Sequence, residues 1–196
     1  MIFASTTPSR AAELINNEVV STKWVDAMKP PFDAPSELSH IDRSQLQSIR
    51  LLTPNVEVVR YDGMHYVHKF MGYTSQPSSF EKEIMHHKRV LGSRFVPRLC
   101  NVVTFNGENH GLLLEFIDGG NLSDLSSSIE RSQLSRVSAT ILEAIEDFES
   151  RGYYPQDLKC GNIVLHNCDW SLFVVDLGGG FSEYMHLKEA IPADAQ

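Results

Sequence analysis

Two short apolar strands bordered by polar residues constrain this chain more than any other feature. The first strand is preceded by Asp157, Lys159 and Asn162, and the second covers residues 173–175 and ends at Asp176, which is followed by Leu and Gly. Strands that deliver two Asp, a Lys and an Asn to one edge suit a metal-bound polyphosphate, because Mg²⁺ prefers carboxylate and amide oxygens. We therefore expect a polyphosphate site in this part of the chain.

Length and composition predict an ordinary globular protein of one domain or two small lobes. The chain has 196 residues, of which 42% are hydrophobic and 21% charged, which is enough for a buried core. A net charge of −8 without any basic run disfavours nucleic-acid binding. No apolar run approaches the roughly 20 residues that span a bilayer, so we expect no membrane segment. The three cysteines lack metal-ligand spacing, which favours reduced thiols and a cytoplasmic location.

Alternating apolar residues and turn signals predict a sheet in the first half of the chain. Two hairpins are expected from four strand-like stretches, at residues 56–61, 65–70, 102–105 and 111–117. Asp62-Gly63 joins the first pair, and such a dipeptide favours a hairpin turn because glycine tolerates positive φ. Between the hairpins we expect a helix that is capped by Ser78 or Ser79 and stopped by Gly92.

The second half predicts helices followed by the two strands of the site. A Gly-Gly break at 118–121 precedes a short helix over 122–125 and a longer helix that is capped by Ser132 and ends at Gly152. A short helix is predicted over 11–20, and residues 44–52 fit either a helix or a strand. The order indicates an α+β fold of two lobes. The expected parts are an N-terminal extension over 1–50, a first lobe over 51–117 and a second lobe over 118–196.

A lysine and a glutamate in the first lobe extend the candidate site. Lys69 lies on the predicted strand over 65–70, where a lysine ordinarily faces solvent. Glu81 and Glu83 follow on the predicted helix, and either carboxylate could hold the ammonium group against phosphate oxygens. We prefer Glu83, which stands twelve residues before the turn that starts at Phe95. Taken singly, such residues ordinarily cap turns or face solvent, so the prediction depends on the whole set.

The spacing of this set resembles a known family. Asp157-Leu158-Lys159-x-x-Asn162 resembles the catalytic loop of the protein kinase superfamily, and Asp176-Leu177-Gly178 is similar to its metal-binding Asp-Phe-Gly, with Leu for Phe. The resemblance covers about residues 56–180 and includes the strand lysine, the helix glutamate and a hinge over 112–122. Within that family, the chain resembles the divergent, truncated kinase-like proteins of filamentous fungi.

The resemblance implies a reduced two-lobed kinase-like fold, with an antiparallel first-lobe sheet, one helix in that lobe, and a small helical second lobe without the late helices. It implies ATP and Mg²⁺ as cofactors. The implied catalytic residues are Asp157 and Lys159, and the implied metal ligands are Asn162 and Asp176. The implied nucleotide-binding residues are Lys69, Glu83, Leu114 as gatekeeper, Glu115 and Ile117.

The chain also departs from the family pattern. The Gly-rich phosphate lid is missing, and Thr53-Pro54-Asn55 stands in its place. Pro155-Gln156 replaces the His-Arg that precedes the catalytic Asp. The family's activation segment and later helices are absent, so we expect the N-terminal extension or a second copy of the chain, as in a homodimer, to cover the second lobe.

Three functions remain open from the sequence. The first is an ATP- and Mg²⁺-dependent phosphotransferase that acts on a hydroxyl group of a small molecule or a protein. The second is a pseudokinase-like module that binds nucleotide or a partner without chemistry. The third is a kinase-fold enzyme with another reaction, such as nucleotidyl transfer. A histidine metal site is not expected, because the adjacent His86 and His87 face different sides of a helix.

Overall fold

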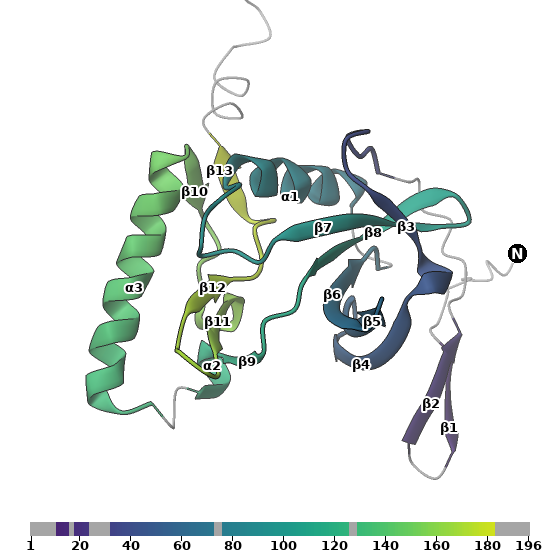
Figure 1. Cartoon of the computed structure of the whole chain (residues 1–196), viewed down its shortest axis with the longest axis horizontal. Helices are drawn as coiled ribbons and strands as arrows, with labels where there is room; N and C mark the ends of the chain where they lie inside the picture. Colours follow the sequence, from purple (N-terminus) through teal and green to yellow (C-terminus); the bar gives the residue numbers. More distant parts are fainter. Residues whose placement is uncertain (1–10, 16–17, 24–31, 73–75, 126–128, 183–196) are drawn as a thin grey trace, which may run out of the picture.

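The structure is a computed structural model, which describes residues 11–15, 18–23, 32–72, 76–125 and 129–182 (Figure 1). These residues form a mixed α+β arrangement with a six-stranded sheet and few helices. The predicted α+β class is therefore confirmed. The six-stranded sheet belongs to the first half of the chain, and the longest helix and several short strands belong to the second half.

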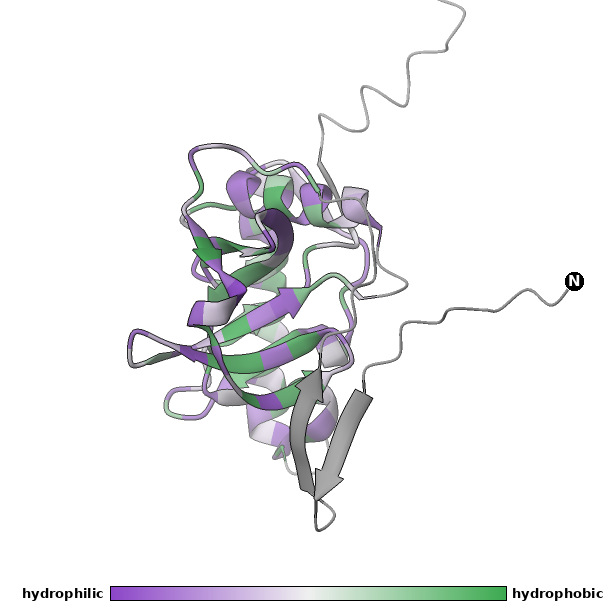
Figure 2. Ribbon diagram, turned by 90° about the vertical axis from the view of Figure 1, so that its right-hand side faces the viewer, coloured by the Kyte–Doolittle hydropathy of each residue, from purple (hydrophilic) through white to green (hydrophobic). Residues whose placement is uncertain are grey.

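The six-stranded sheet has the order β3-β7-β8-β6-β5-β4. Its strands are β3 (His40–Asp42), β4 (Gln47–Thr53), β5 (Val56–Tyr61), β6 (Met64–Phe70), β7 (Leu99–Phe105) and β8 (Glu108–Glu115). Both predicted hairpins are present, and hydrophilic and hydrophobic residues both occur along the strands of the sheet (Figure 2). Asp62 and Gly63 adopt φ values of 46° and 76°, and Asn106 and Gly107 adopt 53° and 80°, so each hairpin turns at the residues that tolerate positive φ.

Residues 32–53, most of which the sequence placed in the extension, contribute to this sheet. β3 pairs with β7 in parallel, so the sheet is antiparallel everywhere except at this edge. The 3-10 turn η1 (Arg43–Gln45) leads into β4, and the expected boundary at residue 50 falls inside that strand. The helix predicted over residues 11–20 is wrong, because β1 (Ala11–Ile15) and β2 (Glu18–Lys23) form an antiparallel pair there. Residues 16–17 lie outside the described part.

One face of the sheet is covered by α1 (Pro77–Arg89), which is the helix predicted between the two hairpins. The helix begins earlier than expected. Gln76 is its N-cap and Pro77 occupies the first turn, where the missing N–H of proline is tolerated. Ser79 donates its hydroxyl to the carbonyl of Gln76 at 2.6 Å rather than capping the helix itself. The core between α1 and the sheet consists of Phe32, Met71, Phe80, Ile84, Val102 and Leu112.

The second half is built around α3 (Arg131–Ser150), the long helix at the left of Figure 1. The other elements are β9 (Gly119–Asn121), α2 (Leu122–Leu125), β10 (Tyr153–Pro155), the 3-10 turn η2 (Cys160–Asn162), β11 (Ile163–His166), β12 (Leu172–Val174) and β13 (Gly180–Ser182). α3 begins at a Glu130 N-cap with a capping box to Gln133, and not at Ser132 as predicted. The two strands expected at the site are β11 and β12, and they pair antiparallel.

A second core packs α3 against β11 and β12. Val137, Ala144 and Phe148 are the buried residues of α3, and they belong to the same core cluster as Leu165 and Leu172. β9 joins β11 on its other side, where a Cβ on Gly119 would stand only 2.0 Å from the Leu165 carbonyl oxygen. Among the described residues, no helix is both long enough and apolar enough to cross a membrane.

Candidate functional site

Lys69 meets two carboxylates where β6, α1 and the segment after β12 come together. Its Nζ lies 2.7 Å from Glu83 Oε2 and 3.0 Å from Asp176 Oδ1. Lys69 points to the α1 side of the sheet, because its strand neighbours His68 and Phe70 face the other side and are fully buried. The structure therefore joins three sequence-predicted residues that are up to 107 positions apart.

Burial and charge act against each other in this group. Burial alone would lower the pKa of Lys69, but the negative charges of Glu83 and Asp176 outweigh it and raise that pKa. Burial likewise works to raise the pKa of Asp176, but the Lys69 ammonium group and the Gly178 amide hold it below its ordinary value. Burial raises the pKa of Glu83, and the attraction of Lys69 works in the opposite direction. At neutral pH the group holds an ammonium ion that bridges the helix and the segment after β12.

The loop between β10 and β11 gathers the other three predicted polar residues. Lys159 Nζ contacts Asp157 Oδ2 at 2.5 Å. The Asn162 amide nitrogen donates to the Asp157 carbonyl at 3.0 Å and to Asp157 Oδ2 at 3.3 Å. The η2 turn makes these contacts possible. The backbone N–H of Asn162 donates to the Lys159 carbonyl, which brings positions 157, 159 and 162 together. Asp157 is thus fixed by two neighbours of its own loop.

The two groups belong to one site because their backbones touch. The Val175 amide donates to the Asn162 carbonyl at 3.0 Å, which ties the residue before Asp176 to the loop. A Cβ added to Gly179 would stand 2.8 Å from Asp157 Cβ. Glycine is therefore needed at 179 for the segment after Asp176 to lie against Asp157. The charge of Lys159 also helps to lower the pKa of Asp176.

The predicted base-binding residues lie at the end of β8. Leu114 is buried and pairs with Val67 on β6, two residues before Lys69. Glu115 is exposed, and its backbone N–H donates to the Arg98 carbonyl at 2.9 Å. Ile117 is half-buried in the connection that leads to β9. The structure thus places Leu114 and Glu115 on the strand that pairs with β6, and Ile117 in the connection that follows it, all three outside the ionic group itself.

Sequence reasoning missed a second set of residues behind Asp176. His86 and His87 of α1 are both buried, although their adjacency suggested opposite faces. His86 Nδ1 lies 2.7 Å from the Leu177 carbonyl oxygen, and the Tyr153 hydroxyl donates to the same oxygen at 3.2 Å. The helical spacing was the available signal, since His86 and His87 follow Glu83 by three and four positions and share its side of the helix.

A metal ion at this site would be bound through oxygen ligands. In the described part of the chain no group of three or more His, Cys, Asp and Glu side chains is arranged to hold a metal ion. Asp176 and Asn162 offer a carboxylate and an amide oxygen, which are ligands that Mg²⁺ accepts when phosphate oxygens and water complete its shell.

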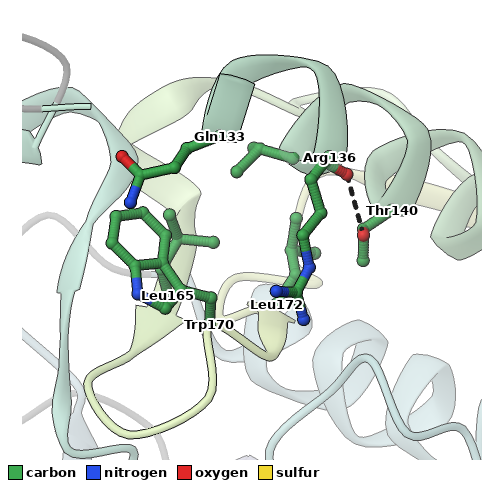
Figure 3. Close-up of a pocket in the computed structure, with 7 residues that line it drawn as sticks. Gln133, Arg136, Thr140, Leu165, Trp170 and Leu172 are labelled. Carbon is green, nitrogen blue, oxygen red and sulfur yellow. Dashed lines mark hydrogen bonds between the residues drawn. The ribbon is translucent and has the colours of Figure 1, made fainter. Parts of the chain in front are cut away.

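A cavity of about 130 Å³ lies apart from this site, between α3 and the β11–β12 hairpin (Figure 3). Arg136 and Gln133 stand at its rim, and Trp170 forms one wall. Trp170 adopts φ 62° in the hairpin turn, an uncommon conformation for an aromatic residue. The cavity includes none of the residues that the sequence predicted for the site.

Comparison with known proteins leaves the site to be interpreted from its own geometry. No protein-family model matches the chain, and no curated protein matches it either.

Proposed function

We propose that this protein is an ATP- and Mg²⁺-dependent phosphotransferase with a reduced, two-lobed, kinase-like fold. The first lobe would hold the six-stranded sheet and α1, and the second lobe would hold the elements from β9 onward. The observation that carries the proposal is the position of Lys69 Nζ, between Glu83 at 2.7 Å and Asp176 at 3.0 Å. A strand lysine held by a helix carboxylate can present its charge to phosphate oxygens.

The donor set supports a Mg²⁺-bound triphosphate. Lys69 and the Gly178 amide both bond Oδ1 of Asp176, and the side chain of Asp176 is 40% exposed. Asn162 uses its amide nitrogen on Asp157, and its amide oxygen is the atom that would serve a metal. Asp176 and Asn162 would hold Mg²⁺, which would offset phosphate charge when bound with the nucleotide.

Asp157 and Lys159 would act on the acceptor. A hydroxyl oxygen attacks the γ-phosphorus, the bond from phosphorus to the bridging oxygen breaks and leaves ADP, and the hydroxyl proton passes to Asp157. Lys159 would then turn from Asp157, its partner at 2.5 Å in this structure, toward the transferred phosphoryl group and offset its charge. The acceptor would be a hydroxyl group of a small molecule or of a protein.

Nucleotide turnover by the purified protein tests this proposal. ADP formation from Mg·ATP should be measured with serine peptides and with polyols as acceptors, and the product checked for a phosphoryl group. Asp157→Ala should lower turnover by at least about 100-fold, and Asp176→Ala should also weaken the response to Mg²⁺. Glu146→Ala, on the exposed side of α3, is the matched control and should change neither quantity. Wild-type turnover in both aspartate variants would refute the assigned roles.

One observation favours a binding module without chemistry as the second candidate. β4 and β5 are joined by the short turn at Pro54-Asn55, and the Asn55 carbonyl accepts a hydrogen bond from the Phe70 amide at 2.9 Å. This turn contains no glycine and supplies no flexible loop of amides over a phosphate. Thermal stabilisation by Mg·ATP with no ADP formed under any acceptor condition would favour the module over the phosphotransferase.

A further inference from the structure

The carbonyl oxygen of Leu177 is held by two buried side chains from different parts of the chain. His86 on α1 contacts it through Nδ1 at 2.7 Å, and Tyr153 on β10 donates its hydroxyl at 3.2 Å. The two rings also contact each other, with centroids 5.0 Å apart. Leu177 itself is fully buried. The residue that follows Asp176 is therefore fixed from both halves of the molecule.

The chemistry of this contact defines the state of both donors. A carbonyl oxygen only accepts, so His86 must carry its proton on Nδ1. His86 Nε2 is buried and has no hydrogen-bond partner in the described part of the chain. Burial lowers the pKa of His86 and raises the pKa of the Tyr153 hydroxyl. At neutral pH the histidine is therefore neutral, the tyrosine is protonated, and both donate.

These bonds act on Asp176 through one rigid unit. The Leu177 carbonyl and the Gly178 N–H belong to the same planar, trans peptide group, in which C=O and N–H point in opposite directions. The Gly178 N–H donates to Asp176 Oδ1 at 3.1 Å, and that oxygen is the one that Lys69 contacts at 3.0 Å. Holding the carbonyl therefore aims the amide at the carboxylate.

We propose that His86 and Tyr153 are positioning residues, which orient the Leu177–Gly178 peptide and thereby hold the Asp176 carboxylate where Lys69 and a metal-bound nucleotide meet it. This inference rests on the proposed function of the site. An apolar side chain at position 86 would fill the space without burying an unpaired nitrogen, whose cost is comparable to a lost hydrogen bond. What only the histidine contributes here is the Nδ1 donor.

The first test observes the peptide directly, in the protein without nucleotide. Hydrogen exchange and the ¹⁵N shift of the Gly178 amide are measured by NMR for wild type, His86→Leu and Tyr153→Phe. Losing one buried hydrogen bond should accelerate Gly178 exchange by roughly threefold to tenfold, relative to amides of the six-stranded sheet. His86→Asn should restore slow exchange. The side-chain nitrogen of asparagine is bonded to Cγ, as Nδ1 is in histidine, so it can donate to the Leu177 carbonyl in place of Nδ1.

Phe148→Leu is the matched control. Phe148 packs edge-to-face on the Tyr153 ring at 5.6 Å, and its side chain has no donor that could bond the Leu177 carbonyl. This variant should lower overall stability without a selective change at Gly178. Tyr153→Phe removes a single oxygen atom, so it keeps the test decisive even where His86→Leu disturbs the fold.

The second test measures the Mg²⁺ concentration that supports half-maximal ATP binding. His86→Leu and Tyr153→Phe should raise it by a similar factor, and His86→Asn should return it toward wild type. Unchanged Gly178 exchange in both variants overturns the inference, and so does faster exchange with an unchanged Mg²⁺ requirement. If the wild-type protein binds no Mg·ATP, the proposed function fails, while the Gly178 response still decides whether His86 and Tyr153 hold this peptide.

Discussion

Acid should destabilise this protein through His87, a buried histidine on the inner side of α1. Burial lowers the pKa of His87 from 6.5 to about 4, with further contributions from the charges of Lys69 and His86 and an opposing one from Asp176. In the unfolded chain the histidine regains its ordinary pKa. Between pH 6.5 and 4 the unfolded state therefore binds more protons than the folded state, so stability is fully present above pH 6.5 and is lost as the pH falls.

The size of the effect follows from the two pKa values. Each pKa unit corresponds to about 1.4 kcal/mol, so His87 should remove about 3 kcal/mol from the free energy of unfolding between pH 7 and pH 4. That loss is a large part of the 5–15 kcal/mol that is usual for a folded domain. His68 and His86 also have lowered pKa values, but they are retained in the variant below and cancel in the comparison.

The assay is denaturant unfolding at several pH values between 7 and 4, followed by far-ultraviolet circular dichroism. His87→Leu keeps an apolar group at the site and removes the proton-binding ring, so its free energy of unfolding should fall by about 3 kcal/mol less than that of wild type. His65→Leu changes an exposed histidine of β6 and should follow the wild-type pH dependence. An equal loss in wild type and His87→Leu would refute the reasoning.

Two substitutions test the packing that supports the site. Gly119→Ala places a Cβ 2.0 Å from the Leu165 carbonyl oxygen, so it should break the β9–β11 pairing and cost at least about 2 kcal/mol in denaturant unfolding; wild-type stability would show that the strands separate freely. Phe32→Ala removes a buried ring that stacks on Phe80 at 5.2 Å, and should cost about 3–5 kcal/mol. Leu91→Ala at an exposed position of the same half should stay within about 0.5 kcal/mol, and equal effects of the last two would contradict the burial of Phe32.

Local patterns were sufficient where an element is defined by its own residues. The alternation around Asp62-Gly63 predicts the β5–β6 hairpin, because a turn that needs positive φ admits few other residues. The choice of Glu83 over Glu81 is matched by the contact to Lys69. Glu81 instead accepts a hydrogen bond from the backbone N–H of Asp33.

Non-local contacts were beyond the sequence. β3 is three residues long and buries only Ile41, so it has no period to read, and it pairs with β7, which lies about sixty residues further on. His86 and His87 are both buried because their side of α1 is covered by the segment after Asp176, and a helical pattern shows which residues share a side but not what packs against it. The two helices do not begin at the predicted serine caps. Pro77 occupies the first turn of α1, and the Glu130 capping box starts α3, so each helix begins before the serine.

The segment before β4 also determines where the chain can be truncated without exposing its core. It crosses α1, where Phe32 stacks on the helix and Lys88 pairs with Glu37. Further along the segment, Ile41 and Leu46 pack in one core cluster with side chains of the sheet. A fragment trimmed at residue 50 would leave Val59, Val103 and Leu113 open to water and would loosen the helix that carries the partner of Lys69. The smallest unit worth expressing on its own therefore starts no later than residue 32.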